Sequence, residues 1–240
     1  MAATTTPSDS PPARPPAPEG RRRPISRFAL VERALHWTNA ALFLVLIGTA
    51  AVLYLAPLSA AVGRRPLVRN VHVVAGLLLP VPWLVARWGP WSAPLAADVR
   101  LMGRFDVFDR RWIRSFGRDP FARLGKFHPL QKLNAAFTAG SIPVMLGTGA
   151  VMRWFHWFPL DWRTGATFVH DWVSLALFVT VAIHIAKAVV DREALGGMWR
   201  GRVSLGWARR HHPRWAEEVA GPASTGPGEG LKRDRAETET

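Results

Sequence analysis

The 240-residue chain contains no cysteine. Without a thiolate it cannot hold an iron–sulfur cluster through cysteine or attach a c-type haem through a C-x-x-C-H motif. It also cannot form a disulfide, so its folding needs no oxidising compartment. Any redox-active metal centre in this chain would have to depend on histidine or methionine ligands.

Charged side chains are nearly absent from four long stretches. Residues 34–63, 70–86 and 133–152 contain no Asp, Glu, Lys or Arg, and residues 164–186 contain only Asp171. A bilayer core of about 30 Å needs roughly 20 apolar residues in a helix, with about 17 as a usable minimum. The sequence therefore predicts an all-α membrane protein, a bundle of four transmembrane helices. These spans are expected at about 33–56, 68–88, 131–153 and 164–191.

The formal net charge is +14, with 31 Lys or Arg against 17 Asp or Glu. This charge alone would suggest nucleic-acid binding, but its distribution follows the predicted spans. Six arginines precede the first span, eight basic residues occupy 100–126 and ten follow from Lys187 onward, whereas the other two connections hold five in all. Basic residues in alternate loops indicate the cytoplasmic side of a membrane. We therefore expect both termini and the middle loop to be cytoplasmic, next to membrane lipids and without a nucleic acid partner.

Composition divides the chain into three parts. Residues 1–26 are rich in proline and are expected to be disordered, as is the low-complexity segment 218–240. Residues 27–217 then form one four-helix membrane domain. Within it, Pro80 and Pro82 are expected to kink the second span.

Four histidines lie inside the uncharged stretches: His36, His72, His170 and His184. An ionisable side chain at membrane depth is costly, so it usually faces the bundle interior and carries function. His170 and His184 are 14 residues apart, which puts them on nearly one helix face and about 20 Å apart along its axis. This spacing suits two stacked cofactors, one near each membrane surface. Interhelical hydrogen bonding or a proton pathway is the alternative role for such histidines.

The predicted topology decides which histidines lie at the same depth. His36 and His184 fall near the cytoplasmic face, and His72 and His170 fall near the outer face. A neutral imidazole is a common axial ligand of haem iron. These two pairs therefore predict two non-covalent b-type haems, because pairing His36 with His170 would have to bridge about 20 Å of helix rise.

Two further residues are candidates for cofactor binding. Gly76 lies one turn after His72 on the same helix face, where it would let a flat macrocycle approach the backbone. Close helix packing explains such a glycine equally well. Asn39, three residues after His36, could hydrogen-bond a haem propionate or a histidine nitrogen.

Four segments resemble the gamma (cytochrome b) subunit of respiratory formate dehydrogenase, within the wider dihaem cytochrome b561 and hydrogenase-type cytochrome b superfamily. They are RFALVERALHW (27–37), HVVAG (72–76), HDWVSLALFVTVAIH (170–184) and GMWRGRVSLGWARRHHPRWAEEV (197–219). The first three contain the candidate haem histidines. The last has no obvious role in holding haem, and it favours the formate dehydrogenase branch over hydrogenase or thiosulfate-reductase cytochromes.

The resemblance implies an electron-transfer, quinone-reducing subunit of a formate dehydrogenase (formate:quinone oxidoreductase) complex in the bacterial cytoplasmic (inner) membrane. A catalytic alpha subunit outside the membrane would oxidise formate, and an iron–sulfur beta subunit would pass electrons to the outer haem. The electrons would then cross to the inner haem and reduce menaquinone or ubiquinone near the cytoplasmic face. This transfer across the membrane would generate a membrane potential. This chain would perform no formate chemistry itself. Complexes of this kind often form trimers, so a higher oligomer is compatible with the resemblance.

The resemblance also implies a quinone site beside the inner haem, in the loop that enters the third span. This loop is GKFHPLQK (125–132), with His128 where the family has Asn followed by an aromatic residue and Gly. His128 could replace the Asn as a hydrogen-bond donor or relay protons, and Gln131 matches the family. Lys187, one turn after His184, could pair with a propionate or a quinone oxygen, or extend to the headgroups.

Two other functions fit part of the pattern. A stand-alone or hydrogenase-type cytochrome b quinone oxidoreductase would use the same histidines without a formate-oxidising partner. A haem-free membrane anchor would only tether a partner complex, and it would leave the four histidines without a purpose. Co-purifying subunits test the first alternative, and haem absorbance tests the second.

Overall fold

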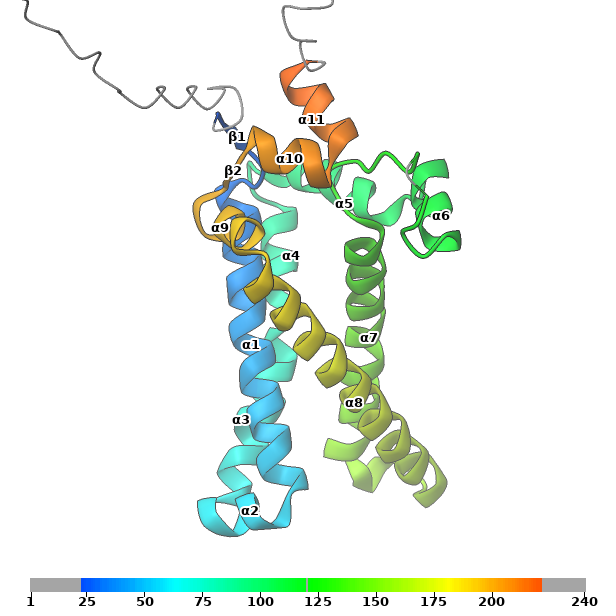
Figure 1. Ribbon diagram of the computed structural model, residues 1–240. Coiled ribbons are helices and arrows are strands. Elements are labelled where there is room, and N and C mark those ends of the chain that lie inside the picture. The colour runs from blue at the N-terminus through cyan, green and yellow to red at the C-terminus, as the bar shows by residue number, and fades with distance from the viewer. Residues whose placement is uncertain (1–22, 120, 222–240) are drawn as a thin grey trace, which may run out of the picture.

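The computed structural model describes residues 23–119 and 121–221, and the fold is mostly helical (Figure 1). The longer helices are α1 (Leu30–Tyr54), α3 (Arg65–Leu78), α5 (Ser92–Gly103), α7 (Pro129–Arg153) and α8 (Leu160–Val190). The shorter ones are α2 (Ala56–Val62), α4 (Val81–Arg87), α6 (Val107–Arg114), η2 (Phe155–Trp157), α9 (Arg192–Arg200), α10 (Leu205–His211) and α11 (Pro213–Ala220). Two short strands, β1 (Pro24–Ser26) and β2 (Arg202–Ser204), complete the fold.

Four helical segments are long and apolar enough to cross a membrane. They are Leu30–Tyr54, Arg65–Arg87, Pro129–Arg153 and Leu160–Val190. This confirms the four predicted long apolar helices and fits a multi-pass membrane protein.

The second and fourth spans begin earlier than predicted, at residue 65 instead of 68 and at residue 160 instead of 164. In both cases a proline opens the helix: Pro66 lies in the first turn of α3, and Pro159 is the N-cap of α8. Proline is favourable at these positions because its φ angle is already close to helical and its missing N–H would have no partner there. The basic residues just before the apolar runs are therefore part of the helices.

The predicted kink in the second span is a short interruption at Leu79 and Pro80, between α3 and α4. Pro80 and Pro82 lack the N–H groups that would continue the helix, and the N–H of Leu79 instead bonds to the carbonyl three residues back, at 3.2 Å. Asn39 of α1 lies against this interruption. In the amide orientation that satisfies both neighbours, it donates to Leu79 O at 3.3 Å and accepts from Trp83 Nε1 at 2.5 Å. A side chain of the neighbouring helix thus satisfies the interrupted backbone.

The spans pack as two antiparallel hairpins. α1 packs mainly on α3, to which it is joined by α2, and α7 packs mainly on α8, to which it is joined by η2. Figure 1 shows α8 running diagonally from α9, beside α1, to the foot of α7. Large apolar side chains point outward along the spans, and Leu44, Phe178 and Ile183 are each more than half exposed. Such a continuous apolar surface suits lipid.

One end of the bundle is covered by a folded unit that we call the cap, residues 23–28, 92–119, 121–128 and 192–221 (Figure 1). In it, β1 pairs antiparallel with β2, with Ile25 opposite Val203. α10 and α11 pack against this strand pair and enclose a small apolar core. Its members are Ile25, Val203, Leu205, Trp207, Ala208, Trp215 and Ala216.

The cap shifts both predicted limits of the ordered domain. The N-terminal segment predicted to be disordered, 1–26, ends in an ordered strand, because Ile25 is buried against the cap core. At the other end α11 continues to Ala220, past the predicted limit at 217, because Trp215 and Ala216 anchor it in the same core. The rest of both segments, 1–22 and 222–240, lies outside the described residues.

Candidate functional site

Each of the four membrane histidines faces a histidine from another helix. His36 of α1 lies beside His184 of α8 at the cap end of the bundle, with ring centroids 6.0 Å apart and planes inclined at 56°. His72 of α3 lies beside His170 of α8 toward the opposite end, with centroids 6.3 Å apart and planes inclined at 59°. We call these the cap-end pair and the far pair. They are the same two pairs that depth matching along the sequence predicts.

The spacing and chemistry of both pairs fit a haem iron. A bond from a metal to an imidazole nitrogen is about 2 Å long and the ring centroid lies about 1 Å behind that nitrogen, so two axial rings on one iron have centroids about 6 Å apart. Both pairs already have this separation. Among the residues that the structure describes, no three His, Cys, Asp or Glu side chains cluster as a metal site. Two axial donors alone suit a cofactor that brings its own equatorial ligands.

Glycines leave room beside the far pair. A Cβ atom added to Gly76 would meet only Leu46 Cδ2, at 3.9 Å, so close helix packing does not explain this glycine. A Cβ added to Gly149 of α7 would lie 3.5 Å from Cε1 of His170. By contrast, the other candidate cofactor contact, Asn39, is engaged at the α3–α4 break and hydrogen-bonds there instead of to a histidine ring.

Two threonines that the sequence did not single out contact the far pair. Thr49 Oγ1 of α1 lies 2.9 Å from His72 Nδ1, and Thr148 Oγ1 of α7 lies 2.9 Å from His170 Nδ1. Both threonines stand in similar hexapeptides, IGTAAV (47–52) and LGTGAV (146–151). This short correspondence between the first and third spans is the one sequence feature that could have indicated them.

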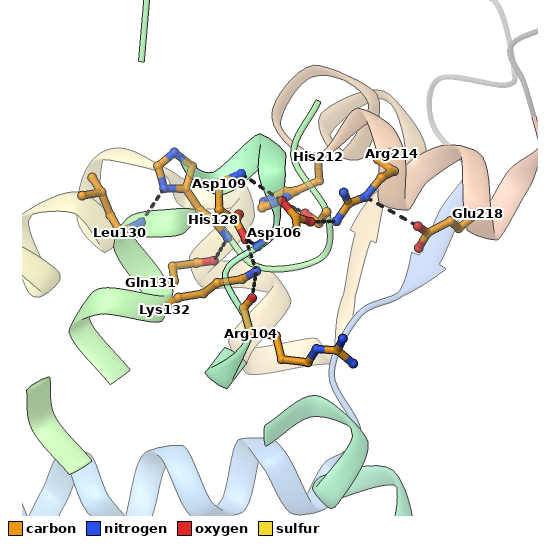
Figure 2. A network of polar contacts seen from close by, with 11 residues as sticks. Arg104, Asp106, Asp109, His128, Leu130, Gln131, Lys132, His212, Arg214 and Glu218 are labelled. Carbon is orange, nitrogen blue, oxygen red and sulfur yellow. Dashed lines mark hydrogen bonds and ion pairs between the residues drawn. The ribbon is translucent and has the colours of Figure 1, made fainter. Parts of the chain in front are cut away.

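The quinone-site candidates His128 and Gln131 cap the N-terminus of α7 (Figure 2). The N–H of Leu130 donates to His128 Nδ1 at 3.1 Å, and the N–H of His128 donates to Gln131 Oε1 at 2.9 Å. This reciprocal capping box satisfies donors that a helix start leaves free. The side-chain oxygen of Gln131 therefore has a structural role, whereas the second ring nitrogen of His128 is not used by the capping box.

His128 presents a neutral N–H donor. Because its Nδ1 accepts a hydrogen bond, the neutral ring carries its proton on Nε2. Burial, together with the positive charge of Lys187, lowers the pKa of His128 to about 4. The ring also lies edge-on to Trp112, with centroids 4.4 Å apart. At pH 7 the Nε2–H group can therefore donate to a carbonyl oxygen without the cost of a buried charge.

An ion-pair network fixes the cap to the start of α7 (Figure 2). Lys132 Nζ lies 2.6 Å from Asp109 Oδ2 and donates to Arg104 O at 2.9 Å, and the side chains of Lys132 and Asp109 are both buried. Asp106, three residues before Asp109, pairs with Arg214 Nη2 of α11 at 2.7 Å. Buried charges are tolerated when they are paired and hydrogen-bonded. The network thus connects α6, α7 and α11 close to His128.

The tail motif W-A-R-R-H-H-P-R-W (207–215) builds the interior of the cap. The guanidinium carbon of Arg27 lies 4.4 Å from the ring centroid of Trp207, and Arg27 Nη2 donates to His212 Nε2 at 3.1 Å. His212 Nδ1 donates in turn to Gly125 O at 2.7 Å. The motif therefore joins the N-terminal segment, the loop before α7 and the C-terminal helices.

The family model and the relatives that match this chain are all cytochrome b proteins. A family model described as prokaryotic cytochrome b561 matches residues 27–201. The cytochrome b556(fdo) subunit of formate dehydrogenase from Escherichia coli K12 is 27% identical over 209 residues, which cover 83% of this chain and 95% of that protein. The nitrate-inducible cytochrome b556(Fdn) subunit of the same organism is 25% identical over 81% of this chain and 91% of its own length. The formate dehydrogenase cytochrome b556 subunit of Haemophilus influenzae is 24% identical over 81% of this chain and 83% of its own length.

Proposed function

Because this chain belongs to the prokaryotic cytochrome b561 family, we propose that it carries electrons across the bacterial cytoplasmic membrane as the cytochrome subunit of a formate dehydrogenase complex. The observation that carries the proposal is the pair of facing histidines at each of two depths. The relatives of similar length named as formate dehydrogenase subunits support the assignment to this kind of complex.

The residues of this chain would hold and orient the redox groups. His36 and His184 would ligate one haem iron, and His72 and His170 the other. When bound, two b haems would supply one-electron redox chemistry near each face of the membrane. The α1–α3 hairpin and α8 would provide one ligand each to both pairs, so the position of α8 relative to this hairpin sets both histidine spacings.

The charge distribution supports one orientation of the chain in the membrane. The cap contains the middle loop and the basic residues from Arg192 to Arg214, which the positive-inside rule assigns to the cytoplasm. The far end would then face outward and receive electrons from an iron–sulfur subunit, which a formate-oxidising catalytic subunit supplies. Oxidation of one formate anion to carbon dioxide releases one proton and two electrons, and reduction of one quinone to quinol consumes two electrons and two protons.

The quinone would bind at the cap end, near His128. The Nε2–H group of His128 is suited to donate a hydrogen bond to a quinone carbonyl oxygen, and the positive Lys187 lies close enough to depress the pKa of this ring. A positive charge there would stabilise the negative charge that develops on a quinone oxygen during reduction. Gln131 would act indirectly, by holding His128 in its capping position.

The test of this function is purification of the tagged chain from the membranes of its source. We expect an iron–sulfur subunit and a large catalytic subunit to co-purify, formate to reduce the b-type absorbance, and a quinone analogue to reoxidise it. A chain that purifies alone, with haem that quinol reduces and formate does not, would favour the stand-alone cytochrome. A partner complex without any haem absorbance would favour the haem-free anchor.

A further inference from the structure

The far pair differs from the cap-end pair in its hydrogen bonds. Thr49 lies 23 residues before His72 and Thr148 lies 22 residues before His170, and each threonine hydroxyl contacts Nδ1 of its histidine at 2.9 Å. The same contact therefore occurs once in each helical hairpin. Within the part of the chain that the structure describes, no side chain hydrogen-bonds the rings of His36 or His184.

The threonine hydroxyls decide the tautomer of the far-pair rings. Each hydroxyl has a single proton, which it donates to the carbonyl four residues earlier: Thr49 to Val45 O at 2.7 Å and Thr148 to Val144 O at 2.8 Å. The hydroxyl oxygen can then only accept from the imidazole, so the ring proton lies on Nδ1. Nε2 keeps its lone pair, which is the form that a metal binds.

We infer that Thr49 and Thr148 are positioning residues. They make His72 and His170 stronger donors to a haem iron than His36 and His184, and they give the haem at the far pair the lower reduction potential. This inference rests on the proposed function. A hydrogen bond from the outer N–H of a ligating imidazole orients the ring and raises the basicity of the ligating nitrogen. Second-shell hydrogen bonding of this kind tunes haem potentials, and a more basic ligand stabilises the ferric state. The far pair therefore favours electron movement toward the cap-end pair.

The test compares variants that differ only in the hydroxyl. Thr49→Val and Thr148→Val keep the branched shape and remove the hydrogen bond, whereas Thr49→Ser and Thr148→Ser keep it. The matched control is Thr164→Val on α8, because its hydroxyl bonds to the carbonyl of Leu160 on its own helix. Haem content, potentiometric titration and EPR spectra of the oxidised holoprotein are measured for each variant.

We expect each Val variant to retain two haems, with an upward shift in the midpoint potential and an altered EPR spectrum for one of them. The Ser variants and the Thr164→Val control should match the unmutated protein. Two haems with unchanged potentials and spectra in the double Thr49→Val/Thr148→Val protein would overturn this inference and leave the proposed function intact. Lack of haem in the folded, unmutated protein would overturn the proposed function instead.

If a Val variant fails to fold, Thr→Ala at the same position makes the same comparison without steric overlap.

Discussion

His212 has both of its ring nitrogens engaged inside the cap. Its Nδ1 proton is donated to Gly125 O and its Nε2 lone pair accepts from Arg27. Burial, and then the charge of Arg27, lower the pKa of His212 to about 3. Burial also lowers the pKa of Arg27, to about 10. At neutral pH the contact is therefore a neutral imidazole that accepts from a charged guanidinium, and the ring has no free site for a second proton.

The cap is accordingly expected to loosen in acid. Between the ordinary histidine pKa of 6.5 and about 3, the unfolded chain binds a proton at His212 that the folded chain does not. Stability therefore rises with pH across this window, by up to about 1.4 kcal/mol per pH unit. The protection factors of the amides of residues 202–220, which compare the observed exchange rates with the intrinsic rates at each pH, should fall as the pH decreases from neutral toward 4.

The variant His212→Gln isolates this effect from the titration of carboxylates. Glutamine keeps a donor and an acceptor but does not titrate in this range. The protection factors of the cap amides should therefore depend less on acid in this variant. Identical pH profiles in the two proteins would contradict the assignment.

Lys132 and Asp109 form the most deeply buried ion pair in the described part of the chain, with 6% and 1% of their surfaces exposed. Removing one partner leaves the other charge buried without compensation, so Lys132→Met should lower the unfolding free energy by about 3 kcal/mol. The double variant Lys132→Met/Asp109→Asn removes both charges and should recover most of that loss. Unfolding in mixed detergent micelles measures both. Equal losses in the single and double variants would show that the charge pair is not the cause.

At the scale of elements, the start of α7 combines a capping box with a candidate quinone site. Gln131 contributes to the box through its side-chain oxygen, which accepts from the N–H of His128. Substitution Gln131→Ala should therefore destabilise the start of α7 by about 1 kcal/mol and reduce quinone turnover indirectly. Gln131→Glu keeps the capping acceptor, so it should retain both stability and quinone turnover. Loss of turnover in Gln131→Glu without loss of stability would place Gln131 directly at the quinone.

The four spans could be predicted from the sequence because a helix in lipid satisfies its own backbone and needs only a charge-free run of sufficient length. The break at Pro80 was predictable for the same local reason, since proline removes a helix hydrogen bond. The pairing of β1 with β2 was not predictable: it joins residues 24–26 to 202–204, and three-residue strands carry no useful periodicity. The buried role of the tail motif likewise depends on Arg27, far away in the sequence.

The sequence could predict which candidate site residues lie at the same depth in the membrane. It could not predict the direction in which a side chain points. His36, His72, His170 and His184 could be paired by their position along each span. Asn39 shows that position along a span does not by itself predict a side-chain contact. It lies three residues after His36, yet its amide reaches the α3–α4 break, because the interrupted carbonyl of Leu79 offers it a hydrogen bond there.

At the scale of the whole molecule, two helical hairpins share one cap. Each hairpin contains one threonine–histidine contact, and α8 contributes a histidine to both histidine pairs. The cap ties the segment before α1, the loop before α7 and the segment after α8 into one unit. It thereby fixes the spacing of the hairpins at the end where the quinone is proposed to bind. The tail motif, which builds the interior of the cap, would affect function through this spacing.

The central claim is that the four histidines form two independent axial pairs, and haem counting in the purified chain tests it most directly. We predict two b haems per chain, about one in each single variant His36→Ala or His72→Ala, and still one in the double variant His36→Ala/His184→Ala, because both of its substitutions fall in the same pair. The double variant His36→Ala/His72→Ala should contain none. A reduced-minus-oxidised spectrum without haem in folded protein, or the loss of both haems from His36→Ala/His184→Ala, would contradict the account.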